Sequence, residues 1–598
     1  MFSGSIHPGH VGQFEWPWVE HFDSHPPPAH GAQRLALRIL ADAWEFLRRS
    51  PFIEYQIEGR LSRLPDFGLA AAEATTEAAR ELLARIDALD FDDLPPAHSV
   101  PLRQARYGLR ARAMAGDWYW TVIDPAGVGF YGQFLPSAYC GGVVLNMVFE
   151  VLENPSLAQP GDLDRQLALL ADLPRLIDQM TERTRGQAER GMRMPRPQIP
   201  SARSLVAAFA ARSNGLAQIA DERFSDATRP LATAFRAEAQ RRIDTQLKPA
   251  FARLAAVFDA DYEAAAPEGV GLSQYEGGAE IYRELVRLHT TLDLSPEAVH
   301  AAGHARLKTI ESEMHAIRAE VGLADDPQGY LARLQADLLY RAADTVGVAA
   351  VFQRYIDRMD AVFAQTFHHG ARARHGVAPL PEALQGSMTF GYYDAPKPGQ
   401  DEGRFLFNAS HLTKNSLFNI GALTYHELVP GHHLHVSTQR ENEFLHPLSR
   451  YAFCNAYNEG WAEYAATLAG EMGCYQTAEE RYGRCAMDAF LTCRLVVDTG
   501  MNALGWSLDR ARDFLRAHST MSEAEIRSET LRYSCDVPAQ ALAYKLGDTE
   551  LLALRDELRQ ARQARGQALD LRDFHAAVLT HGAMPLPDLR REVRRLLS

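Results

Sequence analysis

The sequence lacks any long apolar run. Its longest apolar stretches are short, such as residues 205–211, which lie between Ser204 and Arg212. None approaches the roughly 20 apolar residues that a membrane-spanning helix needs. The N-terminal residues MFSGSIHP also lack the basic and apolar segments of a signal peptide. We therefore expect no membrane partner and a cytoplasmic location.

Basic residues and cysteines are also scarce. The chain has 62 Lys and Arg against 76 Asp and Glu, a formal net charge of −14. A nucleic-acid-binding surface needs an excess of basic side chains, so this balance argues against a nucleic-acid partner. The 6 cysteines never form a Cys-x-x-Cys pair. We interpret them as free thiols in a reducing compartment rather than as disulfides.

A helical pattern extends over most of the 598 residues, because strong helix formers recur with apolar residues three and four positions apart. The clearest segments are 69–89, 162–193, 201–211, 231–258, 296–321 and 342–367. One interruption, residues 386–410, alternates apolar residues around a Pro/Gly/Asp turn. It predicts a hairpin or small sheet that could offer an edge to an extended substrate. We predict a mainly α fold, with an N-terminal helical half over residues 1–266 and a C-terminal catalytic half over residues 267–598.

The first candidate for chemistry is the segment NIGALTYHELVPGHHLH, residues 419–435. In a helical His-Glu-x-x-His motif, two histidines one turn apart bind one zinc ion and the glutamate acts as general base. Here Pro430 stands four residues after His426, and the next histidines are His432 and His433.

Neither later histidine can share a metal with His426 in an undistorted helix. An offset of six residues lies on the opposite face, and an offset of seven lies about 10 Å away along the axis. Pro430 and Gly431 can break or bulge the helix and bring a later histidine round. We favour His432 over His433 because it needs the smaller distortion. The alternative is that ordinary histidines flank a Pro-Gly helix stop.

A second segment, YNEGWAEY at residues 457–464, supplies carboxylates. Glu459 can complete a two-His, one-Glu site with an open position for water. Glu463, one turn later, can hydrogen-bond a ligating histidine. The neighbouring residues are largely apolar, which favours buried, paired carboxylates over a solvated helix face.

Later segments add side chains for substrate binding or support. Arg494 and Asp498 lie one turn apart on an apolar helix, where they could form an ion pair, recognise a carboxylate or support the metal site. Tyr544 could stabilise an oxyanion, although a buried core tyrosine is equally common. Arg532 and Tyr533 could contact a substrate carboxylate.

Together these motifs resemble the bacterial family known as domain of unknown function 885. Residues 426–433 resemble its HExxPGHH signature, residues 459–464 its EGWAxY motif, residues 494–500 its RLVVDTG segment and residues 538–547 its PGQAxxYKxG segment. The resemblance implies a large helical, long-cleft fold similar to zinc metallopeptidases of the thermostable carboxypeptidase and oligopeptidase kind. It also implies one zinc ion per chain on His426, His432 and Glu459, with Glu427 as general base.

The chain departs from that pattern at two positions. Asn502 stands where family members commonly have histidine, and Ala539 stands where they have glycine. An asparagine can donate a hydrogen bond but cannot shuttle a proton.

Three functions are compatible with these observations. The leading hypothesis is a zinc-dependent hydrolase of peptide or small amide substrates, in which Glu427 transfers the proton and Tyr544 stabilises the oxyanion. The second, motivated by Asn502, is metal-dependent elimination or rearrangement of a small metabolite. The third is a helical binding protein with a degenerate metal site.

Overall fold

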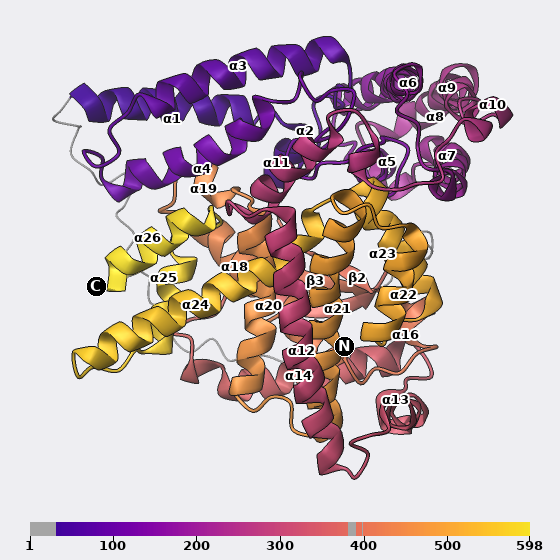
Figure 1. Ribbon diagram of the computed structural model, residues 1–598. Coiled ribbons are helices and arrows are strands. Elements are labelled where there is room, and N and C mark those ends of the chain that lie inside the picture. The colour runs from indigo at the N-terminus through magenta and orange to yellow at the C-terminus, as the bar shows by residue number, and fades with distance from the viewer. Residues whose placement is uncertain (1–30, 381–389, 398, 598) are drawn as a thin grey trace.

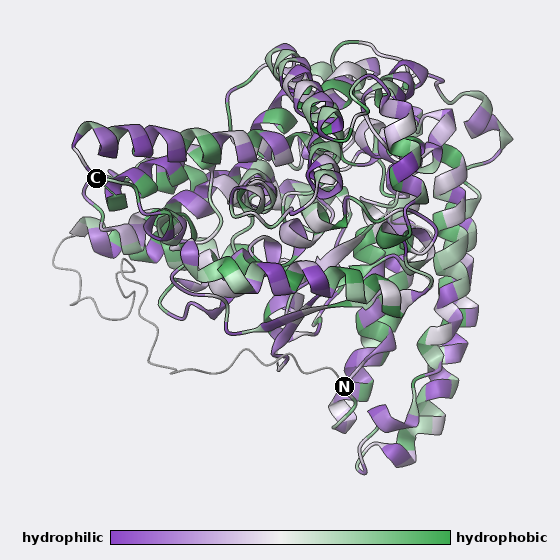
Figure 2. Cartoon of the chain, turned by 90° about the horizontal axis from the view of Figure 1, so that it is seen from below, coloured by the Kyte–Doolittle hydropathy of each residue, from purple (hydrophilic) through white to green (hydrophobic). Residues whose placement is uncertain are grey.

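Helices form most of this protein. The computed structural model describes residues 31–380, 390–397 and 399–597, and these residues form helices, connecting loops and one three-stranded sheet. The predicted mainly α fold is therefore confirmed. No described helix is long and apolar enough to cross a membrane, and hydrophilic and hydrophobic residues alternate along the helices (Figure 2).

The N-terminal helices form a layer over one side of the molecule, at the top of Figure 1. They are α1 (Gly31–Leu47), α2 (Pro51–Glu58), α3 (Leu69–Asp87) and α4 (Pro96–Arg112). Helices α1, α3 and α4 pack through apolar residues one turn apart, such as Ile39 and Ala43 on α1 and Leu82 and Ile86 on α3. Burial of such stripes stabilises the layer.

A second helical group follows in the chain. It contains α5 (Gly141–Glu153), α6 (Pro160–Glu189), α7 (Ile199–Arg212), α8 (Ala232–Arg242), α9 (Lys248–Ala255) and α10 (Ala260–Ala264). The helix predicted over residues 231–258 extends from Ala232 to Ala255, and a π-helical turn at Ile243–Leu247 lies between its α8 and α9 segments. Pro249 follows this turn and cannot donate a backbone hydrogen bond, so a wider turn replaces the regular one.

Two pairs of long helices organise the rest of the chain. Helix α12 (Pro296–Glu320) packs along α21 (Ala478–Asn502), and α20 (Asn455–Glu471) packs along α24 (Ala543–Ala564). Helices α20 and α24 approach closely at two glycines, since a Cβ on Gly460 would lie 2.5 Å from Gly547 Cα. The other helices described after residue 270 are α11 (Gly278–Thr290), α13 (Pro327–Ala336), α14 (Thr345–Val362), α16 (Ala409–Leu412), α17 (Ile420–Glu427), α18 (His432–Glu441), α19 (Pro447–Arg450), α22 (Leu508–His518), α23 (Glu523–Leu531), α25 (Leu571–Leu579) and α26 (Leu586–Leu597).

The sheet has the strand order β1-β3-β2. Strands β2 (Gly391–Asp394) and β3 (Glu402–Phe407) are antiparallel, which confirms the predicted hairpin; residues 386–389 of the predicted segment lie outside the described residues. Strand β1 (Arg374–Pro379) pairs in parallel with β3 and precedes the predicted segment. Its sequence RHGVAP contains glycine and proline and shows little alternation, so it gave no strand signal.

Hydrophobic clusters cross the boundary predicted at residue 266. Val122 and Tyr131 pack in one cluster with Tyr282 and Leu542. Both sides of the boundary also contribute walls to one cavity. The division of the chain into two halves stays a prediction.

Candidate metal centre

A break between two helices determines the geometry of the predicted site. Helix α17 ends at Glu427 and α18 begins at His432. The peptide bond before Pro430, between the two helices, is cis. The departure from a regular helix is therefore a complete break rather than a π-type bulge.

Two contacts fit this break to its surroundings. Gly431 lies so close to the preceding turn that a Cβ would be 1.9 Å from the carbonyl oxygen of His426, so no larger residue fits. Trp461, on α20, donates its Nε1 hydrogen bond to the carbonyl oxygen of Pro430 over 2.9 Å. The HExxPGHH and EGWAxY motifs are thus in direct contact.

Three of the predicted residues converge beside the break. His426 Nε2 lies 3.6 Å and His432 Nε2 lies 3.3 Å from Glu459 Oε2. One ligand atom from each residue lies within 4.8 Å of the other two. Across the described ranges no second group of three His, Cys, Asp or Glu donors converges in this way.

The donor types and the two histidine–glutamate distances fit a zinc ion. Imidazole nitrogens and carboxylate oxygens bind zinc at about 2.0–2.2 Å, which places donors of a tetrahedral site about 3.3–3.6 Å apart. Glu459 Oε2 is buried and accepts no hydrogen bond from the described residues. Burial alone would raise the pKa of Glu459, but the imidazoles of His426 and His432 outweigh burial and lower it. A buried carboxylate oxygen of this kind is unfavourable unless a cation lies beside it.

Glu463 orients His426 from the side opposite Glu459. Glu463 Oε2 lies 3.4 Å from His426 Nδ1, and its Oε1 lies 2.6 Å from Arg484 Nη2. Burial would lower the pKa of His426, but the carboxylates of Glu459 and Glu463 raise it to about 10. The contact of a carboxylate with the second nitrogen of a histidine is typical of metal sites, where it fixes the ring orientation.

Two supporting residues escaped the sequence analysis. His435 Nε2 lies 3.0 Å from His432 Nδ1, and burial lowers the pKa of His435 well below its usual range. The spacing of His432 and His435, three residues apart on one helix, could have indicated this contact. Arg484 comes from α21, and nothing in its local sequence links it to Glu463.

Glu427 and Tyr544 both line the cavity next to the three donors. Burial raises the pKa of Glu427, and the nearby imidazoles of His432 and His426 only partly oppose it. The Tyr544 ring stacks on the His426 ring, with centroids 5.9 Å apart and an interplanar angle of 11°. Burial raises the pKa of Tyr544 to about 12. Tyr544 therefore keeps its hydroxyl proton.

His433 faces the sheet instead of the three donors. Its Nδ1 lies 2.9 Å from the Tyr393 hydroxyl, and its Nε2 lies 3.0 Å from the carbonyl oxygen of Ala373. Burial lowers the pKa of His433 to about 3. The structure thus places His432, and not His433, beside His426.

Arg494 and Asp498 do not pair with each other, contrary to one of the roles predicted for them. Arg494 donates to Glu529 over 3.0 Å and to the Tyr533 hydroxyl over 2.9 Å. Asp498 accepts a hydrogen bond from the Tyr282 hydroxyl over 2.7 Å. Each side chain has a partner on another element, so spacing along α21 alone did not predict the pairing. Arg494 lines the cavity and Asp498 does not.

Asn502 and Ala539 both contact Asp498. Asn502 Nδ2 donates to Asp498 Oδ1 over 3.2 Å, and Asn502 Oδ1 accepts from the backbone of Leu272 over 2.9 Å. The backbone N–H of Ala539 donates to Asp498 over 3.1 Å. Ala539 has a φ of 66°, a left-handed conformation that explains why glycine is the usual family residue. Asn502 does not line the cavity, so its contacts are structural.

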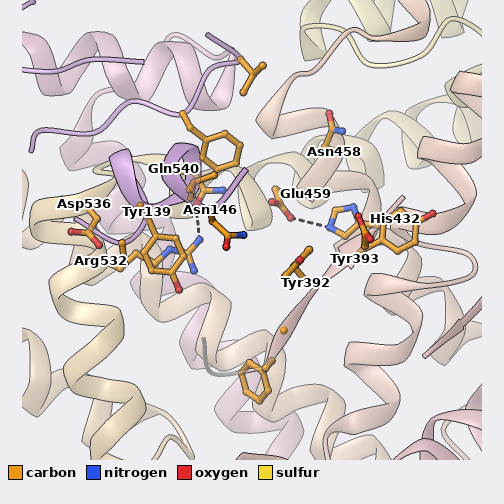
Figure 3. Close-up of a pocket in the computed structure, with 18 of the residues that line it drawn as sticks. Tyr139, Asn146, Tyr392, Tyr393, His432, Asn458, Glu459, Arg532, Asp536 and Gln540 are labelled. Carbon is orange, nitrogen blue, oxygen red and sulfur yellow. Dashed lines mark hydrogen bonds and ion pairs between the residues drawn. The ribbon is translucent and has the colours of Figure 1, made fainter. Parts of the chain in front are cut away.

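The three donors lie in the wall of a cavity of about 1400 Å³. This volume exceeds the roughly 300–1,000 Å³ of common small-molecule sites. Helices α5, α7, α17, α20 and α21 and strand β2 all contribute residues to its lining. Figure 3 shows His432 and Glu459 on one side of the cavity and Arg532 with Tyr139 on the other.

Two solved structures share this fold. One is a "putative lipoprotein" from Colwellia psychrerythraea, with a TM-score of 0.82 and 21% identity over 95% of this chain and 99% of that chain. The other is a "putative lipoprotein of unknown function" from Shewanella oneidensis, with a TM-score of 0.66 and 16% identity over 94% of this chain and 99% of that chain. At these identities the likeness concerns the fold alone. No curated protein matches the chain.

A family model described as "Bacterial protein of unknown function (DUF885)" matches residues 54–593. The motifs occupy about the last third of the chain, whereas this match also includes the helices that form the N-terminal wall of the cavity. The chain therefore belongs to the DUF885 family of bacterial proteins of unknown function.

Proposed function

We propose that this protein is a zinc-dependent hydrolase of peptide or related amide bonds. The proposal rests on the convergence of His426, His432 and Glu459 in the wall of a large cavity, with Glu427 beside them. Two imidazoles, one carboxylate and an adjacent general base are the protein groups that zinc-assisted hydrolysis requires.

His426, His432 and Glu459 would hold the ion. When bound, zinc would polarise the scissile carbonyl and lower the pKa of a water molecule. Glu463 and His435 hold the two imidazole rings in position through their second nitrogens.

Glu427 and Tyr544 supply the proton transfer and the oxyanion contact. The Glu427 carboxylate accepts a proton from the attacking water and passes it to the leaving nitrogen. Its raised pKa suits both steps, since the group must gain and then release the proton. Tyr544, stacked on His426, donates its hydroxyl hydrogen bond to the oxyanion of the tetrahedral intermediate.

We do not retain the elimination or rearrangement hypothesis. It was motivated by Asn502, whose amide contacts Asp498 and Leu272 and does not line the cavity. A different residue at that position therefore gives no reason to expect a different reaction.

Metal analysis and one substitution test the proposal. We expect one zinc per chain in the purified protein and its loss in His426→Ala and Glu459→Ala. Glu427→Gln should retain zinc and lose turnover of peptide and N-acyl amino acid substrates. Full activity in Glu427→Gln would contradict the mechanism. Absence of zinc from the wild-type protein would instead favour a helical binding protein with a degenerate site.

We also propose that the protein works in a reducing compartment, the cytoplasm. All 6 cysteines are free, and Cys485 alone among them is not fully buried. Free buried thiols are typical of reducing compartments. The descriptions of the two structural relatives as lipoproteins concern those proteins, and cell fractionation of the native protein is the direct test.

A further inference from the structure

We propose that Arg532 and Arg494 form a subsite for a substrate carboxylate, so that the protein cleaves amide bonds near a free carboxylate terminus. The subsite lies in the same cavity as the three metal donors. This inference rests on the proposed function and specifies its substrate class: peptides and N-acyl amino acids with a free carboxylate.

The two arginines share one carboxylate. Arg494 Nη2 lies 3.0 Å from Glu529 Oε2, and Arg532 Nη1 lies 3.5 Å from Glu529 Oε1. The side chains of Arg494 and Arg532 are only 6% and 12% exposed. A buried positive charge without an anion is unfavourable, so the excess charge of this pair favours an anionic ligand.

Asp536 is a further carboxyl group at this end of the cavity. It accepts a hydrogen bond from Gln198 Nε2 over 2.6 Å, and no arginine or lysine nitrogen of the described residues lies within ion-pair distance of it. Burial raises the pKa of Asp536 to about 7. Asp536 thus forms no ion pair with the two arginines.

Arg532 is held in a fixed position in the cavity wall. Its Nη2 donates to Gln540 Oε1 over 2.8 Å, and its Cζ lies 4.7 Å above the Tyr139 ring. Its Nε is buried and has no hydrogen-bond partner in the described parts of the chain. A fixed, planar guanidinium in the cavity wall suits carboxylate binding through its Nη edge.

One aromatic ring contacts both the metal donors and this subsite. The Tyr544 ring centroid lies 5.9 Å from the His426 ring centroid and 4.7 Å from the Arg494 Cζ. The Arg494 Cζ therefore lies no more than about 10.6 Å from the His426 ring centroid. The contacts of a scissile carbonyl at the donors and of a carboxylate at the arginine take up about 2–3 Å each, and one or two extended residues of about 3.3–3.6 Å span the rest. This spacing favours removal of one or two residues from a C-terminus.

Arg212 provides a matched control in the same cavity. It comes from α7, and its Nε and Nη2 donate to the two carboxylate oxygens of Glu153 over 2.8 and 2.7 Å. Glu153 therefore already balances the charge of Arg212. We expect Arg212→Gln to leave carboxylate recognition unchanged.

The test compares N-benzoyl-Gly-Phe with its C-terminal amide. We expect wild-type kcat/KM to be about 100-fold higher for the acid than for the amide. The amide lacks one charge-assisted hydrogen bond to the arginines, and loss of such a bond reduces affinity by about this factor. Arg532→Gln should reduce this preference at least tenfold, mainly through a higher KM for the acid, and Arg212→Gln should preserve it. Measurements of zinc content and thermal unfolding show whether each variant is folded and contains zinc.

The outcomes separate this inference from the proposed function. Equal cleavage of the acid and the amide would overturn the subsite and leave the hydrolase proposal intact. Loss of the preference in Arg212→Gln but not in Arg532→Gln would also overturn the subsite.

Binding calorimetry decides the case in which neither compound is cleaved. In the Glu427→Gln background, the acid should bind and the amide should not. Addition of Arg532→Gln should abolish binding of the acid. Binding of both compounds, or of neither, would overturn the carboxylate subsite whatever the fate of the hydrolase proposal.

Discussion

Trp461 donates a hydrogen bond from its indole Nε1 to the carbonyl oxygen of Pro430, over 2.9 Å. This contact joins the helix that carries Glu459 to the break that separates His426 from His432. The relative position of the three predicted ligands therefore depends on a residue that touches none of the three donor atoms.

Trp461→Phe should weaken zinc binding. The substitution leaves the buried Pro430 carbonyl without a donor, which costs about 1–3 kcal/mol of the free energy of unfolding. We expect the zinc dissociation constant to rise about tenfold. Loss of a residue that supports the metal ligands typically weakens metal binding about 10–100-fold, and this value is the lower limit of that range. Urea denaturation and competitive zinc titration measure the two quantities. Trp506→Phe, which alters a tryptophan packed in a different cluster, should leave zinc affinity unchanged.

Gly431→Ala should prevent formation of the site. An added Cβ would lie 1.9 Å from the His426 carbonyl oxygen, and both groups are backbone-fixed. We expect a loss of more than about 3 kcal/mol in the free energy of unfolding and loss of bound zinc. Gly470→Ala on α20 is the control, because the nearest atom to its Cβ would be a Tyr475 side-chain carbon 3.4 Å away. A folded, zinc-loaded Gly431→Ala protein would show that the break can adopt another conformation.

Glu463→Gln should lower both stability and zinc affinity. The substitution removes the carboxylate that faces His426 Nδ1 and leaves Arg484, whose side chain is only 11% exposed, without this partner. Breaking a buried ion pair from one side costs about 3–5 kcal/mol, and loss of the contact to a ligating histidine weakens metal binding about 10–100-fold. Denaturation and zinc titration again measure the changes. Glu284→Gln, which removes a half-exposed partner of Arg287, should change the free energy of unfolding by less than about 1 kcal/mol.

His575 should make the protein less stable in acid. Burial lowers the pKa of His575 to about 3, so the folded protein keeps this ring neutral while the unfolded chain protonates it near pH 6.5. Below pH 6.5 the unfolded state binds more protons, and the free energy of unfolding falls by up to about 1.4 kcal/mol per pH unit down to pH 3.

His575→Gln isolates this contribution. The variant loses the contacts of the ring to Tyr464 and Thr366 at every pH, but it also loses the protonation penalty. The stability difference between wild type and variant should therefore be larger at pH 7 than at pH 5. Urea denaturation at both pH values measures it, and an equal difference at the two values would show that His575 does not titrate as described.

Local sequence predicted the helices and the hairpin because their signals lie within a few residues. Local sequence did not predict features that depend on contacts between residues far apart in the chain. Strand β1 forms because β3 offers it a partner. Arg494 points to Glu529 on α23 rather than to Asp498 one turn away, since the tertiary fold places a carboxylate there.

The sequence by itself determined the family motifs, the mainly α fold and the break at Pro430 and Gly431, because proline and glycine act on their own backbone. Only the tertiary structure decided which histidine faces Glu459, since His432 and His433 are adjacent in the chain and differ only in the direction of their side chains. It also decided the composition of the cavity. Tyr139 and Arg532 lie in contact although almost four hundred residues separate them, and such a pairing depends on how whole helices pack.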